Sequence, residues 1–400
     1  MNIEGMMDVS EEQSRSLKAE ADTAKSDLLY LDGMMKYYEK ILRIKELRKD
    51  FCWVVMYVPV ELLYAMDITF LDLELHSLYN LYLEGSCESY LSSAASHGFP
   101  IEICSLHRVL EGMNLKGDLP IPDFVITSSQ CCDLTITFGD IGRKHGKNSF
   151  ILDWPYRYDA DGLSFYTREL EELVSFLQEE TGKKLSFERL EETLMLSCQT
   201  ETLYRRIYQL RERIPCPLRS SESFKHLFYF YLMAGTPEGL AYFQQVHREM
   251  EAELENGKSP IGEERFRLLF LYLPPVPYME ILDWLEEEFG AVVVMDSFGS
   301  WWFQDSLNPS HPIQSLAKKG FYNQVPRQVG GPLSYWLEEV VANAKQFKID
   351  GAVQINHIGC KQGCAATRAL TDSLKEFDIP TLAIDLDVLD PSVTSKEEVM

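Results

Sequence analysis

Two cysteines of this sequence follow short apolar runs that are expected to be buried strands. Cys132 comes soon after Pro122–Ser128, while Cys360 stands between Ala352–Ile355 and the helical stretch Lys361–Phe377. Open α/β sheets bind ligands in the crevice outside the carboxyl ends of their strands. The N-terminus of a helix also lowers the cost of forming a thiolate. These positions are typical of a metal ligand or a nucleophile.

A third cysteine, Cys104, is expected at the start of a helix after an irregular turn. If the two α/β units that carry Cys132 and Cys360 face each other, their thiols reach one cleft. Three cysteine thiolates suit an iron–sulfur cluster with one iron left open, because thiolate is the usual ligand of such clusters. The sequence lacks compact Cys-x-x-Cys runs, and free cysteine is often buried, so a packing role is the alternative.

Other titratable residues offer both functional and structural interpretations. Glu61 could act as a base or orient a hydroxyl group, or it could simply be an acid favoured by a helix dipole. His357 could donate a hydrogen bond to a cluster or substrate, complete a Cys3His zinc site, or be a satisfied core histidine; His107 has the same ambiguity. Three carboxylates end the last expected strand: Asp385, Asp387 and Asp390. They suit either magnesium or, more simply, solvent.

Composition and charge restrict the class of protein. With 400 residues, of which 46% are hydrophobic, the chain is expected to form two or three domains. The formal charge of −24 argues against nucleic-acid binding, because no basic face exists to displace phosphate counterions. Neither a targeting signal nor a membrane-spanning run is apparent, so a cytoplasmic protein is expected. Nine cysteines, an odd number, indicate reduced thiols or metal ligands rather than a disulfide framework.

Strand-length apolar runs alternate with helical patterns in two parts of the chain, which indicates parallel sheets covered on both faces. The expected strands are Cys52–Val58, Ile68–Leu75, Pro122–Ser128, Ser149–Trp154, Leu268–Leu273, Ala291–Met295, Ala352–Ile355 and Thr381–Ile384. The predicted organisation is an N-terminal helical segment (1–48), a first α/β domain (49–165), a helical connector (166–262) and a second α/β domain (263–400). Within the last, Phe298–Gly331 is predicted to be irregular and suited to binding.

Several segments together resemble the 2-hydroxyacyl-CoA dehydratase and benzoyl-CoA reductase family. They are HGFPIEICSLHR around Cys104, SSQCCD around Cys132, NHIGCKQ and IPTLAIDLDVLDP around and after Cys360, MYVPVELLYAMDI at 56–68, and EETGKKLSFERLEETL at 179–194. The likeness covers most of the chain from about residue 50, with the three cysteines in order and similarly spaced. As a set these motifs are specific.

The resemblance implies a fold of two flavodoxin-like α/β domains with a helical element. It also implies a [4Fe–4S] cluster held by Cys104, Cys132 and Cys360, with Glu61 near the active cleft. Cys132 is preferred to Cys131 because the family pairs this ligand with a following Asp. The additional neighbours Cys131 and Cys364 leave a larger cluster open, as in the family's double-cubane relatives.

The implied activity is that of an ATP-activated, oxygen-sensitive 2-hydroxyacyl-CoA dehydratase, which removes water through a ketyl radical. The implied partners are a homologous second subunit, a separate ATP-hydrolysing iron–sulfur activator and an acyl-CoA substrate. The chain itself has no Walker-type Gly-x-x-x-x-Gly-Lys-Ser/Thr motif, which fits a separate activator. The candidate contacts for CoA phosphates are Lys144, Lys147, Lys318, Lys319 and Arg327.

Three alternatives remain from the sequence. A benzoyl-CoA-type or double-cubane-type reductase subunit would use related chemistry. A non-catalytic partner subunit would relay electrons through its cluster while the other chain binds CoA. A zinc-holding α/β protein would use the same cysteines as ligands without redox chemistry.

Overall fold

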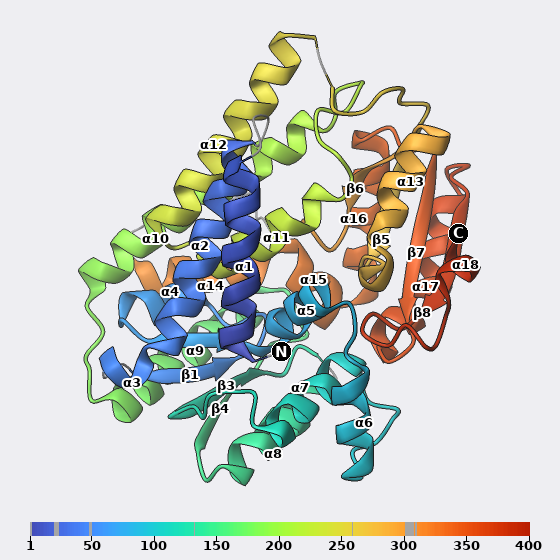
Figure 1. Ribbon diagram of the computed structural model, residues 1–400. Coiled ribbons are helices and arrows are strands. Elements are labelled where there is room, and N and C mark those ends of the chain that lie inside the picture. The colour runs from blue at the N-terminus through green and yellow to red at the C-terminus, as the bar shows by residue number, and fades with distance from the viewer. Residues whose placement is uncertain are drawn as a thin grey trace.

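In the part of the chain that the structure describes, eight strands form two four-stranded sheets, and every pairing within them is parallel. The computed structural model describes residues 2–19, 24–47, 50–131, 133–257, 259–300, 308 and 310–400. The strands are β1 (Phe51–Val54), β2 (Thr69–Asp72), β3 (Phe124–Ser128), β4 (Asn148–Leu152), β5 (Phe266–Tyr272), β6 (Ala291–Asp296), β7 (Gly351–His357) and β8 (Thr381–Leu386). The predicted α/β class with two parallel sheets is therefore confirmed, and Figure 1 shows the two sheets as separate lobes.

Both sheets share one topology. The strand orders are β2-β1-β3-β4 and β6-β5-β7-β8, so in each lobe the chain first adds a strand on one side and then crosses to the other. The order reverses between β1 and β3 in the first lobe and between β5 and β7 in the second. Such a switch point opens a crevice at the carboxyl ends of the strands. The turns after β3 and β7 therefore lead directly into the two crevices.

Burial explains why these runs form central strands. All four residues of β1 and all five of β3 are buried, as expected for central strands of a parallel sheet covered on both faces. The edge strands β4 and β8 are mostly exposed or half-buried and carry polar residues between apolar ones. Charged and polar residues on an edge strand discourage pairing with another sheet.

Helices cover the sheets and link the lobes. Those before and within the first lobe are α1 (Ile3–Ala19), α2 (Lys25–Leu42), α3 (Ile44–Leu47), α4 (Val60–Ala65), α5 (Leu73–Glu84), α6 (Glu88–Ser96), α7 (Ser105–Lys116) and α8 (Leu134–Lys144). The linking helices are α9 (Ala160–Thr181), α10 (Phe187–Leu210), α11 (Glu222–Met233) and α12 (Pro237–Glu255). In Figure 1 the N-terminal α1 and α2 lie along this helical layer, where α2 contacts α12.

The second lobe adds further helices around its sheet. They are η1 (Val276–Tyr278), α13 (Glu280–Phe289), α14 (Pro312–Tyr322), α15 (Gln324–Gly330), α16 (Leu333–Gln346), α17 (Lys361–Lys375) and α18 (Lys396–Val399). Across the described parts of the chain, a helix with the length and apolar content needed to cross a bilayer is not found.

The prediction that Phe298–Gly331 is irregular is wrong for much of its length, because α14 and α15 occupy 312–330. Pro312 at the first helical turn has the fixed φ that starts a helix. Ile313 and Leu316 then recur at helical spacing and are buried. The high content of Pro, Gly and Asn obscured this pattern. Trp301 and Trp302, which belong to the same stretch, lie outside the described residues.

Helices α6 and α7 approach each other so closely that one position requires glycine. A Cβ atom added to Gly112 would lie 2.1 Å from the backbone oxygen of Tyr90, a contact that backbone atoms cannot relieve cheaply. By contrast, a Cβ on Gly139 of α8 would meet nothing within 4 Å.

Gly112→Ala is therefore expected to lower the free energy of unfolding by about 1–3 kcal/mol, because α6 and α7 must separate. Gly139→Ala, the matched control, should be neutral or raise it by up to about 1 kcal/mol through its better helix propensity. Urea titration followed by circular dichroism measures both. Equal effects of the two substitutions would contradict the close packing of α6 on α7.

Candidate active site

Two of the cysteines singled out from the sequence lie close together where the two lobes meet. Cys104 precedes α7 as its N-cap residue, and Cys360 precedes α17 in the same way after β7. Both are buried, with exposed fractions of 6% and 7%. The turn before Cys360 packs directly on Cys104, since a Cβ atom on Gly359 would lie 2.9 Å from the Cys104 Cα. Residues 104 and 360 are thereby brought together where the turn between α6 and α7 meets the turn that follows β7.

His357 connects these two turns. Its Nε2 atom lies 3.1 Å from Cys104 Sγ, while its Nδ1 atom accepts the Val388 backbone N–H at 3.4 Å. An Nδ1 that accepts leaves the ring proton on Nε2, so the neutral ring donates to the sulfur. Burial lowers the pKa of His357, although the nearby Asp387 carboxylate opposes this. The imidazole is thus positioned as a hydrogen-bond donor to the thiol or thiolate of Cys104.

Cys360 has its own donors. The Tyr272 hydroxyl lies 3.1 Å from Cys360 Sγ, and the Gly363 backbone N–H donates to the same sulfur at 3.4 Å. Burial, followed by the charge of Cys360, raises the pKa of Tyr272 far above its ordinary value, so the phenol keeps its proton and can donate it to a thiolate. Tyr272 has a left-handed φ of 70°, which is strained for a bulky residue. Strain of this kind is typical of functional sites.

The third predicted ligand, Cys132, lies outside the described residues. Its neighbour Asp133 forms an ion pair of 2.7 Å with Lys361, the residue after Cys360. Its other neighbour, Cys131, is half-buried, and its charge contributes to raising the pKa of Tyr272 after burial, Cys360 and Tyr57. The chain on both sides of Cys132 is therefore beside Cys360. Within the described ranges, no group of three or more His, Cys, Asp or Glu side chains has metal-binding geometry.

The chemistry of the described thiols fits a metal cluster. Burial, followed by the neighbouring charge of Cys360, raises the pKa of Cys104 well above the ordinary thiol value. Two adjacent buried thiols lose their protons readily only when a cation compensates the charge. Hydrogen bonds from His357 and Tyr272 toward the sulfurs are also the kind that surround iron–sulfur clusters.

Two other sequence candidates have structural partners. His107 is buried in α7, with Nε2 lying 3.6 Å from Glu74 Oε1. Asp387 was expected to be solvated, and that expectation is wrong, because it is 2% exposed. Its carboxylate lies 3.4 Å from Arg108 Nη2 and 3.9 Å from His357 Nδ1. Asp387 therefore supports the site through Arg108, which lies on α7 four residues after Cys104.

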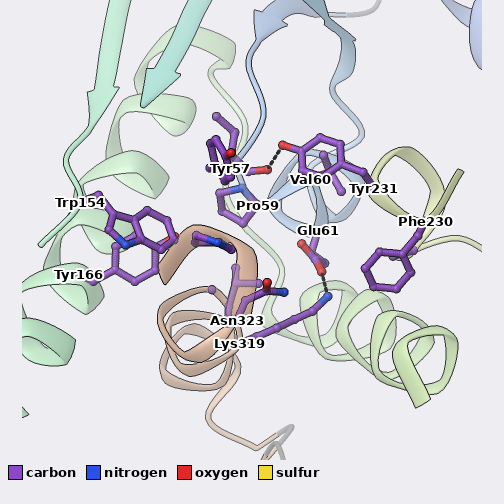
Figure 2. Close-up of a pocket in the computed structure, with 15 residues that line it drawn as sticks. Tyr57, Pro59, Val60, Glu61, Trp154, Tyr166, Phe230, Tyr231, Lys319 and Asn323 are labelled. Atoms are coloured by element: carbon purple, nitrogen blue, oxygen red, sulfur yellow. Dashed lines mark hydrogen bonds and ion pairs between the residues drawn. The ribbon is translucent and has the colours of Figure 1, made fainter. Parts of the chain in front are cut away.

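A small pocket with a volume of about 70 Å³ shares Tyr57 with the surroundings of the cysteines. Its walls are mainly aromatic and aliphatic, and Figure 2 shows Glu61 and Lys319 facing each other within it. The lining residues are Tyr57, Val58, Pro59, Val60, Glu61, Trp154, Tyr166, Phe230, Tyr231, Ala234, Leu316, Lys319, Gly320, Asn323 and Pro326. Tyr57 lines this pocket and is also affected by the cysteines: burial, Glu74, Cys131 and Cys360 raise its pKa, in that order.

Glu61 is one half of a buried ion pair. Lys319 Nζ lies 2.6 Å from Glu61 Oε1, and the Ser197 hydroxyl donates to the same oxygen at 2.6 Å. Burial alone would raise the pKa of Glu61, but the Lys319 ammonium and the two hydrogen bonds outweigh it, so the net direction is downward. Burial likewise opposes the charge of Lys319, and Glu61 and Glu201 overcome it and raise its pKa. The pocket therefore holds a carboxylate that stays ionised in apolar surroundings.

Lys319 is the site residue whose role the sequence did not indicate. It was expected as a CoA-phosphate contact, whereas its side chain is 10% exposed and directed at Glu61. The available signal was its spacing, three residues after Leu316 on the buried face of α14. Two other expected phosphate contacts also have acidic partners: Lys144 with Glu111 at 2.9 Å and Arg327 with Glu339 at 3.6 Å.

Fold and site together define the class: a two-lobed α/β protein with paired thiols between the lobes and a carboxylate pocket beside them. The chain belongs to the family described as 2-hydroxyglutaryl-CoA dehydratase, D-component, whose model matches residues 55–399. It is 24% identical to the (R)-phenyllactyl-CoA dehydratase alpha subunit of Clostridium sporogenes, with 88% of this chain and 87% of the relative covered. It is 23% identical to the (R)-2-hydroxyisocaproyl-CoA dehydratase alpha subunit of Clostridioides difficile (94% and 92%) and 24% identical to a benzoyl-CoA reductase subunit of Thauera aromatica (77% and 77%).

Lys319→Met tests the buried ion pair. It leaves the Glu61 carboxylate buried without its cation, which typically costs about 3–5 kcal/mol of stability near neutral pH. In the wild type the folded-state pKa of Glu61 is lowered, so its stabilising contribution is present above the ordinary value of about 4.5 and is lost as pH falls through the folded-state pKa. In the variant, burial raises that pKa, so the stability deficit should grow as pH rises from about 4.5 to 8.

Chemical denaturation at pH 5 and pH 8 measures this deficit. The matched control is Lys318→Met, which removes the exposed neighbouring lysine and should change stability by less than about 0.5 kcal/mol at both pH values. A Lys319→Met deficit that is the same at both pH values would contradict the ionised state of Glu61.

Proposed function

We propose that this chain is the cluster-bearing subunit of an ATP-activated, oxygen-sensitive 2-hydroxyacyl-CoA dehydratase. Family membership and the alpha-subunit relatives support this proposal. The observation that carries it is the placement of two buried thiols at the meeting of the lobes, next to an apolar pocket that holds an ionised carboxylate. Dehydration of an unactivated acyl chain requires both kinds of group within reach of one substrate.

The cofactor in this proposal is a [4Fe–4S] cluster held by Cys104, Cys132 and Cys360. When bound, it would supply one-electron chemistry and an iron with an open coordination position. The protein's own contribution is to bury the sulfurs and to direct donors at them, from His357 to Cys104 and from Tyr272 to Cys360. Such hydrogen bonds tune the potential of a cluster.

The proposed reaction is a loss of water in which the substrate undergoes no net oxidation or reduction. A 2-hydroxyacyl-CoA loses hydroxide from C2 and a proton from C3, and the products are an enoyl-CoA and water. The C3 proton is too weakly acidic for an ordinary carboxylate. One electron added to the thioester carbonyl gives a ketyl radical anion, which expels the hydroxide and acidifies C3. The electron is regained when the enoyl-CoA forms, so it acts catalytically.

Glu61 is the proposed acceptor of the C3 proton or the group that orients the departing hydroxyl. Its low pKa keeps it ionised, and the apolar walls of the pocket exclude water that would otherwise solvate it. Lys319 holds the carboxylate in place and compensates its charge. His357, the second proposed catalytic residue, donates a hydrogen bond on the cysteine side of the site.

Two protein partners are part of this proposal. A homologous second subunit would complete a heterodimer, and a separate ATP-hydrolysing iron–sulfur activator would supply the low-potential electron. Two relatives are named as alpha subunits, which supports the proposal of a second subunit. The proposed location is the cytoplasm, with neither a membrane nor a nucleic acid as a partner.

A reductase subunit is the second candidate function, because a benzoyl-CoA reductase subunit is a relative over 77% of the chain. It would share the cluster ligands but add electrons to a ring instead of removing water. Anaerobic co-purification with the products of neighbouring genes, followed by assay with ATP, reductant and a panel of thioesters, distinguishes the two. Formation of enoyl-CoA supports the dehydratase, whereas cyclic dienoyl products from benzoyl-CoA would favour the reductase. A colourless, iron-free protein from an anaerobic preparation would contradict both.

Cys360→Ser should abolish cluster assembly, because a hydroxyl is a poor ligand for iron–sulfur clusters. Iron content and broad visible absorption of the anaerobically purified protein measure this. The matched control is Cys87→Ser, which changes another buried N-cap cysteine, at the start of α6, and should keep full iron content. Full iron in the Cys360 variant would defeat the ligand assignment. The same measurement on Cys131→Ser and Cys132→Ser decides which of these two neighbours is a ligand.

Glu61→Gln should lower kcat about 100- to 10,000-fold while leaving iron content unchanged, since an amide cannot accept the proton. The assay is enoyl-CoA formation by the reconstituted complex. The control is Glu286→Gln. Glu286 is also buried, but it belongs to α13, is not among the residues that line the Glu61 pocket, and accepts a hydrogen bond from the Ser220 hydroxyl. An active Glu61→Gln enzyme would remove this residue from the mechanism.

A further inference from the structure

We propose that the acyl chain accepted by this site is short, aliphatic and uncharged. The inference rests on the proposed function, because it takes the Glu61 pocket as the place where the acyl group binds. Its support comes from two independent properties of that pocket, its volume and its charge.

The pocket is smaller than a cavity that is known to hold an aromatic ring. Its volume is about 70 Å³, whereas an engineered apolar cavity that binds benzene measures about 150 Å³. The walls are also held in place. Trp154 donates to the Tyr158 hydroxyl at 3.0 Å and packs on Tyr166 with a ring separation of 4.2 Å. On the other side, the Tyr231 hydroxyl donates to the Val58 carbonyl at 3.2 Å. Walls tied at both sides preserve the small volume.

The pocket is also unsuited to a negatively charged acyl chain. Its lysine is already engaged, because Lys319 donates to Glu61 and to the Ser197 hydroxyl. A second carboxyl group, Glu201, lies 3.8 Å from the same Nζ atom, and the ring of Phe230 lies 5.8 Å from it. One ammonium therefore faces two carboxyl groups. A carboxylate on the substrate would add a third acidic group in apolar surroundings, which is strongly unfavourable.

Thioester affinities test the inference, because the CoA part is common to all ligands and cancels in their ratios. Calorimetry on the anaerobically purified full chain would compare lactoyl-, 2-hydroxyisocaproyl-, phenyllactyl- and 2-hydroxyglutaryl-CoA. We expect the two aliphatic thioesters to bind at least tenfold more tightly than the aromatic and acidic ones. Tightest binding of phenyllactyl- or 2-hydroxyglutaryl-CoA would overturn the inference alone. Failure of every thioester to bind would overturn the proposed function, and this inference with it.

Two variants connect the preference to the pocket. Leu316→Ala enlarges it and should improve phenyllactyl-CoA binding five- to tenfold relative to 2-hydroxyisocaproyl-CoA. Leu177→Ala removes an equally buried leucine that is not among the lining residues, and it should leave this ratio unchanged. Glu201→Gln removes one acidic group and should narrow the gap between the acidic and aliphatic thioesters. Unchanged ratios in Leu316→Ala and Glu201→Gln would show that the acyl group binds elsewhere and would overturn the inference.

Discussion

The contact between the Cys104 thiol and the His357 imidazole is the constraint on which the site depends. It joins the turn between α6 and α7 to the end of β7, and the two residues are 253 positions apart in the chain. The contact requires the end of β7 in the second lobe to meet the turn before α7 in the first lobe. Arg108 and Asp387 form a second link between the lobes, 3.4 Å apart and both buried. Buried polar groups are costly without partners, so these links favour one relative position of the two turns.

The Glu61–Lys319 pair differs from these links, because the packing of the fold does not require an ion pair at this position. Replacing a buried ion pair with apolar side chains of similar volume is often neutral or stabilising. The surrounding walls are already apolar, so such a replacement would suit this pocket. What the pair provides is an ionised carboxylate that water does not solvate, held by Lys319 and the Ser197 hydroxyl. A chemical role accounts for that arrangement better than stability does.

Much of the fold was predictable because strand cores such as AVVVM in β6 are continuous apolar runs. A short run of this kind is typical of a strand that is buried on both faces of a parallel sheet. The positions of Cys104 and Cys360 at strand and helix ends also followed from local pattern. Helix α14 did not, because its Pro-, Gly- and Asn-rich surroundings resemble a loop. The partnership of Lys319 with Glu61 depends on α10 packing against both α4 and α14, a long-range arrangement that local spacing does not encode. Cys132, predicted from sequence, lies outside the described residues.

Tyr57 and Tyr272 show how the two lobes combine into one site. They follow or end the first strands of the two sheets, β1 and β5, and both have left-handed φ values, 77° and 70°. A strained backbone at the same topological position in each lobe brings two phenols toward Cys360, whose charge helps raise the pKa of both after burial. Tyr57 also lines the Glu61 pocket, so the surroundings of the thiols and those of the carboxylate share this side chain. The proposed electron chemistry and proton chemistry would therefore occupy adjacent apolar compartments, reached by different parts of one substrate.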